Sequence, residues 1–281
     1  MQYGPALRAA AGIAVLSVMD AVIKAMAVHY PTFQVACLRF ACGSVIATGV
    51  VAVMRPGWPS RETVVSNLLR SIAAVATAIF FFYALSQLPL AETLVLSFLA
   101  PMFIALFGAL LLKEKIDGRV VAALAIGFTG TLVVVLGQIE EGGNSRSWLG
   151  VAAALASAVT YGFSLALLRQ RAQRDKYLHI VFFQNIGPAV LSAPLAALVW
   201  MPLSLEHLAW FMVMGVLGFI GHVFMATAYA KAEAARLAPL EYTALIWAVL
   251  IGYGFFSEVP TWATLGGGLL IVGSAFLTSR R

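Results

Sequence analysis

Long apolar stretches separated by short polar segments make up nearly the whole chain. Each stretch has about 20 residues, the length that a helix needs to cross roughly 30 Å of hydrocarbon. The separators carry turn and charge signals, such as the Pro- and Gly-containing segment 55–60 and the acidic segment 140–146. This pattern predicts an all-α integral membrane protein of ten transmembrane helices. The expected spans are 6–27, 32–54, 66–88, 91–112, 119–138, 148–170, 178–200, 209–230, 235–256 and 261–279.

The composition supports a membrane protein. Of the 281 residues, 62% are hydrophobic and 11% are charged, whereas soluble domains have about 45–50% apolar and roughly 25% charged residues. The net charge of +6 could suggest nucleic-acid binding, but the basic residues stand at span ends, where they meet lipid headgroups. We therefore expect a lipid bilayer as the main partner and no nucleic acid. Cys37 and Cys42 lie on different faces of one span, so they predict neither a disulfide nor a metal site, and no cofactor is expected.

Lysine and arginine are distributed very unevenly between the two sides of the predicted bundle. With ten spans, both termini lie on one side, and that side collects almost all basic residues. The other side has only Lys24 and Arg146, while Arg39 lies inside a span. Because cytoplasmic loops carry the excess of positive charge, both termini are expected in the cytoplasm. Segment 113–118 then lies inside and segment 139–147 outside.

The chain contains an internal repeat. Residues 84–114 align with 228–258 at a shift of 144 positions, and both segments end a span with Gly-x5-Glu, at Gly108…Glu114 and Gly252…Glu258. The repeat predicts two five-helix halves, residues 1–138 and 139–281. Since five is odd, the second half is inverted relative to the first. Inverted repeats are typical of alternating-access transporters, whose solute site lies between the halves.

Short motifs in both halves resemble a known family. They are Cys37-Leu-Arg-Phe40, Phe82-Tyr-Ala-Leu85, Leu99-Ala-Pro101, Leu110-Leu-Leu-Lys-Glu114, Leu237-Ala-Pro-Leu-Glu-Tyr-Thr243 and Gly252-Tyr-Gly-Phe-Phe-Ser-Glu258. Their order and spacing over nearly the whole chain resemble the drug/metabolite transporter superfamily with paired EamA-type repeats. The resemblance implies a transporter of small metabolites, with bacterial members that export amino acids across the inner membrane. Import or exchange of nucleoside-like metabolites stays open, and the second half departs from the common pattern by placing Glu241 before Tyr242.

Two opposite charges in the first half are candidates for a solute site. Asp20 and Arg39 lie at the same depth in spans 6–27 and 32–54, and Lys24 stands one turn beyond Asp20. Ionisable groups inside a membrane are costly and tend to face a cavity or one another. Asp20 and Arg39 therefore either form a structural ion pair, or Asp20 binds a substrate ammonium or a proton while Arg39 binds a carboxylate.

A second polar layer is expected in the other half. Asn185, His222 and Glu241 share a depth, and the repeat partner of Glu241 is the uncharged Ser97. A hydrogen bond from His222 to Glu241 would clamp two spans together. Alternatively, the same carboxylate and imidazole would carry a coupling proton.

Aromatic residues within the spans are candidates for lining the path. They are Tyr83, Phe98, Tyr161, Tyr242 and Trp247. A cavity with aromatic walls and few polar points suits amino acids with apolar or aromatic side chains. The glycines of 119–138 and 261–279 predict that these two equivalent spans pack together as supports.

Other classes of protein fit the sequence less well. No Gly-x-Ser-x-Gly or His-Glu-x-x-His motif is present, so an enzyme is not expected. A channel would require a filter loop or a ring of charges, and a structural scaffold gives no reason for the charges inside the spans. The expected function is therefore export of small metabolites, most of all amino acids, across a bacterial inner membrane. The oligomeric state stays open.

Overall fold

The computed structural model describes residues 3–87, 96–139, 148–256 and 262–279, and the regular secondary structure within these ranges is helical. The helices are α1 (Tyr3–Ala27), α2 (Thr32–Met54), α3 (Arg61–Gln87), α5 (Ala100–Leu112), α6 (Gly118–Ile139), α7 (Trp148–Ala172), α8 (Tyr177–Leu198), α9 (Leu205–Tyr229), α10 (Ala234–Leu237), the 3₁₀ helix η1 (Ala238–Thr243), α11 (Ala244–Phe256) and α12 (Trp262–Ser279).

Six described helices are long and apolar enough to cross a membrane: α1, α2, α3, α7, α8 and α9. Ala100–Leu112 and Gly118–Gly130 are shorter apolar segments. Many large apolar side chains lie on the outer surface, among them Leu110, Val121 and Leu269. Such a surface is unfavourable in water and favourable in hydrocarbon, as the apolar pattern of the sequence predicts.

The expected helix 235–256 is interrupted. It consists of the short helix α10, the 3₁₀ helix η1 and the helix α11. Pro239 lies near the start of η1, where its missing N–H prevents a regular α-helical hydrogen bond. The change of helix type within a span is often a functional hinge, and Glu241 lies on this segment.

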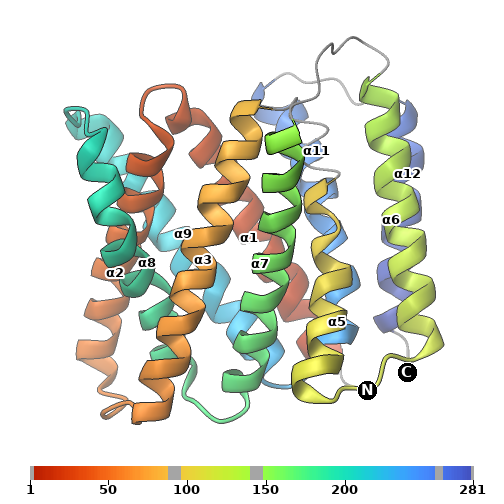
Figure 1. The fold of residues 1–281 in the computed structure, drawn as a ribbon, viewed down its shortest axis with the longest axis horizontal. Coiled ribbons are helices and arrows are strands. Elements are labelled where there is room, and N and C mark those ends of the chain that lie inside the picture. Colours follow the sequence, from red (N-terminus) through yellow and green to blue (C-terminus); the bar gives the residue numbers. More distant parts are fainter. Residues whose placement is uncertain (1–2, 88–95, 140–147, 257–261, 280–281) are drawn as a thin grey trace.

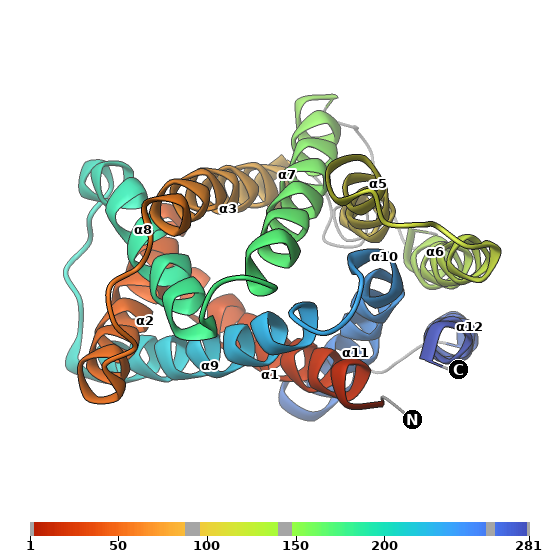
Figure 2. The same cartoon turned by 90° about the horizontal axis from the view of Figure 1, so that it is seen from below.

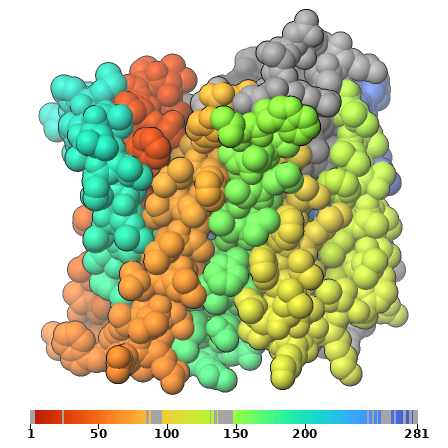
Figure 3. Space-filling view, viewed as in Figure 1, coloured from red at the N-terminus to blue at the C-terminus, as the bar shows by residue number. Residues whose placement is uncertain are grey.

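The helices form an elongated ring when viewed along the bundle (Figure 2), with α2 and α8 at one end. Neighbours in the ring include α1 with α9, α3 with α7, and α2 with α8. The helices α6 and α12 pack against each other at the opposite end (Figure 2), as expected. The glycines of α12 are not the reason, because a Cβ at Gly266, Gly268 or Gly273 would meet nothing within 4 Å. One outer face shows α3, α7, α5 and α6 side by side (Figure 3).

The helix α1 begins and α12 ends at the same face of the molecule (Figure 1). We call it the termini face, and it includes the connections 55–60, 113–117, 173–176 and 230–233. The other face, which we call the opposite face, includes the connections 28–31 and 199–204. The expected outer loop 139–147 lies, apart from Ile139, outside the described residues.

Close approach of α9 to α2 depends on glycine. A Cβ at Gly215 would lie 2.7 Å from the carbonyl carbon of Cys42 and 2.8 Å from the nitrogen of Gly43. Such distances to backbone atoms leave no room for a side chain. Small residues at this crossing therefore set the spacing of the helices that carry Arg39 and His222.

Candidate functional site

Asp20 faces the interior of the ring. Its side chain is accessible to a solvent-sized molecule, yet it lies deep within the protein and not at an outer edge. Its charge acts on Arg39 of α2 and on Tyr161 of α7, which lies across the ring. An exposed group that is within electrostatic range of two other helices lines a space between them. The side chain of Lys24, which the sequence placed near Asp20, lies outside the described part.

Arg39 lies opposite this acid without forming a direct ion pair with it. The two side chains interact electrostatically, but the Nε atom of Arg39 donates to the sulfur of Met19, 3.1 Å away. A thioether is a weak acceptor. The guanidinium is therefore positioned by weak contacts and keeps hydrogen-bonding capacity for another partner.

His222 does not bind Glu241, so the expected hydrogen bond between them is wrong. Its Nδ1 atom pairs with the carbonyl oxygen of Gly218 at 2.5 Å, and its ring lies within electrostatic range of Arg39 and Arg70. The physical reason is that depth along a helix does not determine the direction in which a side chain points. His222 faces α2 and α3, away from η1.

Arg70 is a buried cation that the sequence analysis missed. Its side chain on α3 is 3% exposed. The Nε and Nη2 atoms donate to Oε1 of Gln184, with an Nε distance of 2.8 Å, and Nη1 donates to Oδ1 of Asn67 at 3.2 Å. Because α3 begins at Arg61, five residues before the expected span, Arg70 lies well inside the bundle. From the sequence it had looked like a residue at a span end.

Glu241 forms a cluster with two tyrosines. The hydroxyl of Tyr161 donates to Oε2 of Glu241 at 3.1 Å. The other carboxylate oxygen, Oε1, is buried and has no partner among the described residues, and the same is true of the hydroxyl of Tyr229. Tyr229 is fully buried and lies within electrostatic range of Glu241. One buried cluster thus holds a free acceptor and a free donor.

The remaining expected residues are spread around this region. Phe98 and Trp247 are partly buried against the main core, whereas Tyr83 is 42% exposed and Ser97 is half-buried. The side chain of Tyr242, the residue after Glu241, is fully buried against α6, where a Cβ at Gly127 would lie 2.3 Å from its ring. Asn185 packs onto Gly43 at the crossing of α2 with α8. Tyr161 is therefore the one aromatic candidate among the described residues that binds an expected acid directly.

The Gly-x5-Glu motif of the first half has a direct structural role. The helix α5 ends at Lys113 in a left-handed conformation (φ 56°), so the carboxylate of Glu114 turns back over Gly108. One oxygen accepts from Nε of Arg169 at 2.9 Å, and the other accepts from the nitrogen of Ala234 at 2.8 Å. Glu114 thus caps α10 while it pairs with α7. The corresponding Glu258 lies outside the described residues.

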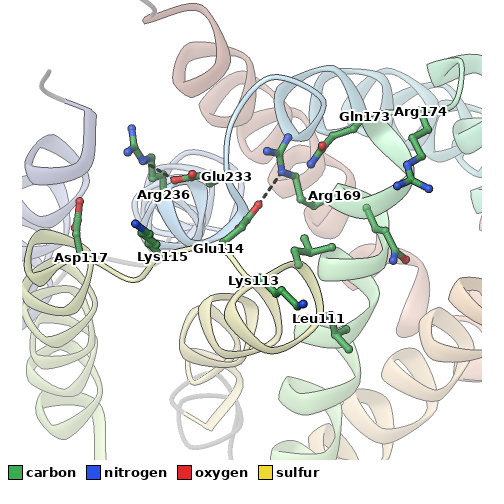
Figure 4. A pocket seen from close by; sticks show the side chains of 12 residues that line it. Leu111, Lys113, Glu114, Lys115, Asp117, Arg169, Gln173, Arg174, Glu233 and Arg236 are labelled. Atoms are coloured by element: carbon green, nitrogen blue, oxygen red, sulfur yellow. Dashed lines mark hydrogen bonds and ion pairs between the residues drawn. The ribbon is translucent and has the colours of Figure 1, made fainter.

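This ion pair is part of the lining of a charged pocket on the termini face (Figure 4). The pocket has a volume of about 720 Å³ and is lined by Lys113, Lys115, Arg174 and Arg236 among others. On its inner side, Arg169 also donates to the carbonyl oxygen of Tyr229 at 2.6 Å. The Glu114–Arg169 pair therefore connects the pocket to the end of α9 that carries Tyr229.

The opposite face is held by a pair of contacts that we call the outer clamp. Tyr30, two residues before α2, pairs with Nδ1 of His207, the third residue of α9, at 2.8 Å. Gln34, the third residue of α2, exchanges two hydrogen bonds with the main chain of Met201, four residues before α9 begins.

A second pair of contacts, the inner clamp, occupies equivalent positions on the termini face. Asp175, two residues before α8, accepts from the hydroxyl of Thr63, the third residue of α3, at 2.9 Å. His179, the third residue of α8, pairs with the carbonyl oxygen of Gly57, four residues before α3 begins. The outer clamp thus joins the start of α2 to the start of α9, and the inner clamp joins the start of α8 to the start of α3 through residues at the same positions relative to the helix starts.

Comparison with known proteins gives consistent relatives. The pseudopaline exporter CntI of Pseudomonas aeruginosa is 29% identical over 270 residues, which cover 94% of this chain and 92% of the exporter. The S-adenosylmethionine uptake transporter of Rickettsia conorii is 26% identical over 257 residues, which cover 91% of this chain and 85% of that protein. A crystal structure with 23% sequence identity superposes with a TM-score of 0.81 over 98% of this chain and 97% of its own, and supports the fold alone.

The two halves of the chain also match one family separately. Residues 6–136 and residues 148–280 each match the EamA-like transporter family. The two matches together cover almost the whole sequence, and the relatives above are metabolite transporters of bacteria. This chain is a multi-pass membrane protein and a transporter, not an enzyme, and it belongs to the EamA-like transporter family of the drug/metabolite transporter superfamily.

Proposed function

We propose that the protein exports small zwitterionic metabolites, first of all amino acids with apolar or aromatic side chains, across a bacterial plasma membrane. The observation that carries this proposal is the pair Asp20 and Arg39. The two opposite charges face the inside of the ring and attract each other without a direct ion pair. Such an arrangement suits a substrate that bears both an ammonium and a carboxylate group, because each end then meets an opposite charge.

The proposal includes alternating access between two inverted halves. The outer and inner clamps support it, because equivalent positions of the two halves form both clamps on opposite faces. The helix pairs agree: α1 with α9 is the counterpart of α7 with α3, while α2 with α8 and α6 with α12 are their own counterparts. A two-fold axis in the membrane plane produces this pattern.

The Glu114–Arg169 pair is the expected gate on the termini face. It lines the charged pocket and is bonded to the main chain of Tyr229, so we expect a solute that moves from the pocket towards Glu241 to require the pair to open. The excess of lysine and arginine on this face supports a cytoplasmic location of the pocket.

A second candidate function is uptake of nucleoside-like metabolites. The similarity to a protein named as an S-adenosylmethionine uptake transporter favours it. An aromatic group such as Tyr161 near two acids suits a cationic, ring-bearing solute. The two functions differ in whether a free amino acid is itself transported.

Counterflow in proteoliposomes separates the candidates. Vesicles loaded with unlabelled phenylalanine are expected to accumulate labelled phenylalanine transiently. Asp20→Asn should reduce this accumulation at least about tenfold, because it removes one charged hydrogen bond to the substrate. The control is Glu206→Gln, which neutralises an exposed acid in the first turn of α9 and should transport normally. Accumulation of nucleosides but of no amino acid would contradict the proposal.

A further inference from the structure

Arg70 and Arg171 are the two buried arginines of the described residues, and their partners differ in charge. Arg171 forms hydrogen-bonded ion pairs with Asp175 at 2.8 Å and with Glu62 at 3.5 Å. Arg70 has only amide oxygens as partners, and no acid of the described chain lies within ion-pair distance of it. Since a buried charge without a counter-ion is costly, Arg70 is not explained as a structural residue in the way that Arg171 is.

The two amides hold the guanidinium in a geometry suited to a carboxylate. Oε1 of Gln184 accepts from both Nε and Nη2, which are the two donors that a carboxylate takes in a side-on bidentate pair. Asn67 is fixed for its own role, because its amide nitrogen donates to the carbonyl oxygen of Thr63 and its oxygen thereby points to Arg70. Gln184 thus supplies one neutral oxygen where a ligand could supply two charged ones.

Arg39 is a second cation on the same side of the ring. His222 of α9 is within electrostatic range of both Arg39 and Arg70, so the helices α2 and α3 each contribute a cation to the region around His222. The acids Asp20 and Glu241 belong to α1 and η1, and both act on Tyr161 of α7. The basic and acidic groups are therefore carried by different helices around the ring.

We propose that Arg70 is a second binding residue for the carboxylate of the transported metabolite, in addition to Arg39, and that this carboxylate displaces the amide oxygen of Gln184. This inference rests on the proposed function, because it assumes a substrate with a carboxylate group. Gln184 then accepts from the donors of Arg70 while no substrate is bound. Asn67 is a positioning residue.

The variant Gln184→Glu tests the assignment because it supplies a permanent carboxylate at the same place. If Arg70 is structural, the new ion pair leaves ligand binding unchanged. If Arg70 binds the substrate, the new carboxylate competes with it. The matched control is Gln87→Glu, which adds the same charge to an exposed residue at the far end of α3, the helix that carries Arg70.

The measurement is the thermal stability of the full-length protein in detergent with 3-phenylpropionate, which has only the carboxylate, and with phenethylamine, which has only the amine. We expect 3-phenylpropionate to stabilise the wild type, and Gln184→Glu to raise the required concentration at least about tenfold, as for loss of a charged hydrogen bond. The phenethylamine response should persist in this variant. An unchanged 3-phenylpropionate response in Gln184→Glu, or its absence in the wild type, would overturn the assignment.

Phenylalanine counterflow distinguishes this inference from the proposed function. Counterflow that proceeds normally in Gln184→Glu would reject the role of Arg70 and leave the proposed function standing. A 3-phenylpropionate response that Gln184→Glu weakens, in a protein that shows no counterflow of any amino acid, would support the carboxylate site and reject amino-acid export.

Discussion

Glu241 combines one hydrogen-bonded and one free carboxylate oxygen. Tyr161 binds Oε2, while Oε1 is buried without a partner among the described residues. An ionised carboxylate is poorly stabilised in such a place, because half of its hydrogen-bonding capacity is lost without compensation from water. The carboxylate is better satisfied when it holds a proton or an ammonium group. Glu241 is therefore the residue where a coupling proton is expected.

Glu241→Gln tests this role with little change in shape. The amide oxygen can still accept from Tyr161, but the side chain no longer exchanges a proton. We expect transport driven by a pH gradient to be lost, while counterflow persists because exchange requires no net proton movement. The measurement is uptake into proteoliposomes with and without an imposed pH gradient.

The control for this variant is Tyr161→Phe, which removes the hydrogen bond but keeps the carboxylate. Its expected effect is a loss of stability of about 0.5–1.5 kcal/mol with the dependence on the pH gradient retained. A Glu241→Gln protein that is only less stable and still responds to the gradient would show a structural role.

Single charges in apolar spans were the part of the site that the sequence made visible. Asp20, Arg39 and Glu241 stand out because each interrupts an apolar run. Their partners could not be predicted, since helical depth does not specify direction: Glu241 meets Tyr161 where His222 was expected. Arg70 was missed because four residues separate it from the expected start of its span.

At the scale of elements, apolar length predicted the helices well. The expected span 32–54 matches α2, and most other helix ends differ from expectation by a few residues. The break in 235–256 was not predicted, because the apolar pattern continues through η1 while Pro239 changes the backbone locally. Nor did the sequence show which helix faces meet, since these helices are apolar on nearly all sides and packing in lipid depends on shape.

Gly215→Ala is expected to disturb the crossing of α9 with α2. The added Cβ would lie 2.7 Å from backbone atoms of α2, so the helices must move apart, at a cost of about 1–3 kcal/mol. The control is Gly49→Ala on α2, where nothing lies within 4 Å of the added Cβ. Thermal unfolding in detergent measures both variants, and equal stability of the two would contradict the close packing.

At the scale of the whole molecule, both clamps are closed in the same structure. In alternating access, the gate on one face opens while the gate on the other face is closed. Because both clamps are closed together, we expect them to be fixed contacts and not gates. They would then form the end of the molecule around which the halves move. The Glu114–Arg169 pair, which joins α5 to α7 and α10, lies nearer the other end and is expected to open.

Cross-linking tests this division. In a protein with Cys37 and Cys42 replaced, a short bifunctional thiol reagent applied to the pair Gln34→Cys and Met201→Cys is expected to leave counterflow intact. The same reagent applied to Glu114→Cys and Arg169→Cys is expected to stop it, because that pair spans the proposed gate. Loss of counterflow with the first pair would mean that the outer clamp opens during transport.

The equivalent clamps have one more consequence, which concerns their independence. In a symmetric dimer of one five-helix chain, each substitution would change both clamps together. A single chain removes that constraint, and the clamps here differ: the inner one includes the ion pairs of Arg171, while the outer one is built from Tyr30, His207 and Gln34. Salt screens the exposed arm of this network, the Arg171–Glu62 pair, whereas the buried Arg171–Asp175 pair is screened much less. Ionic strength on the termini face is therefore expected to act on the inner clamp through Glu62, while salt on the opposite face leaves it unchanged.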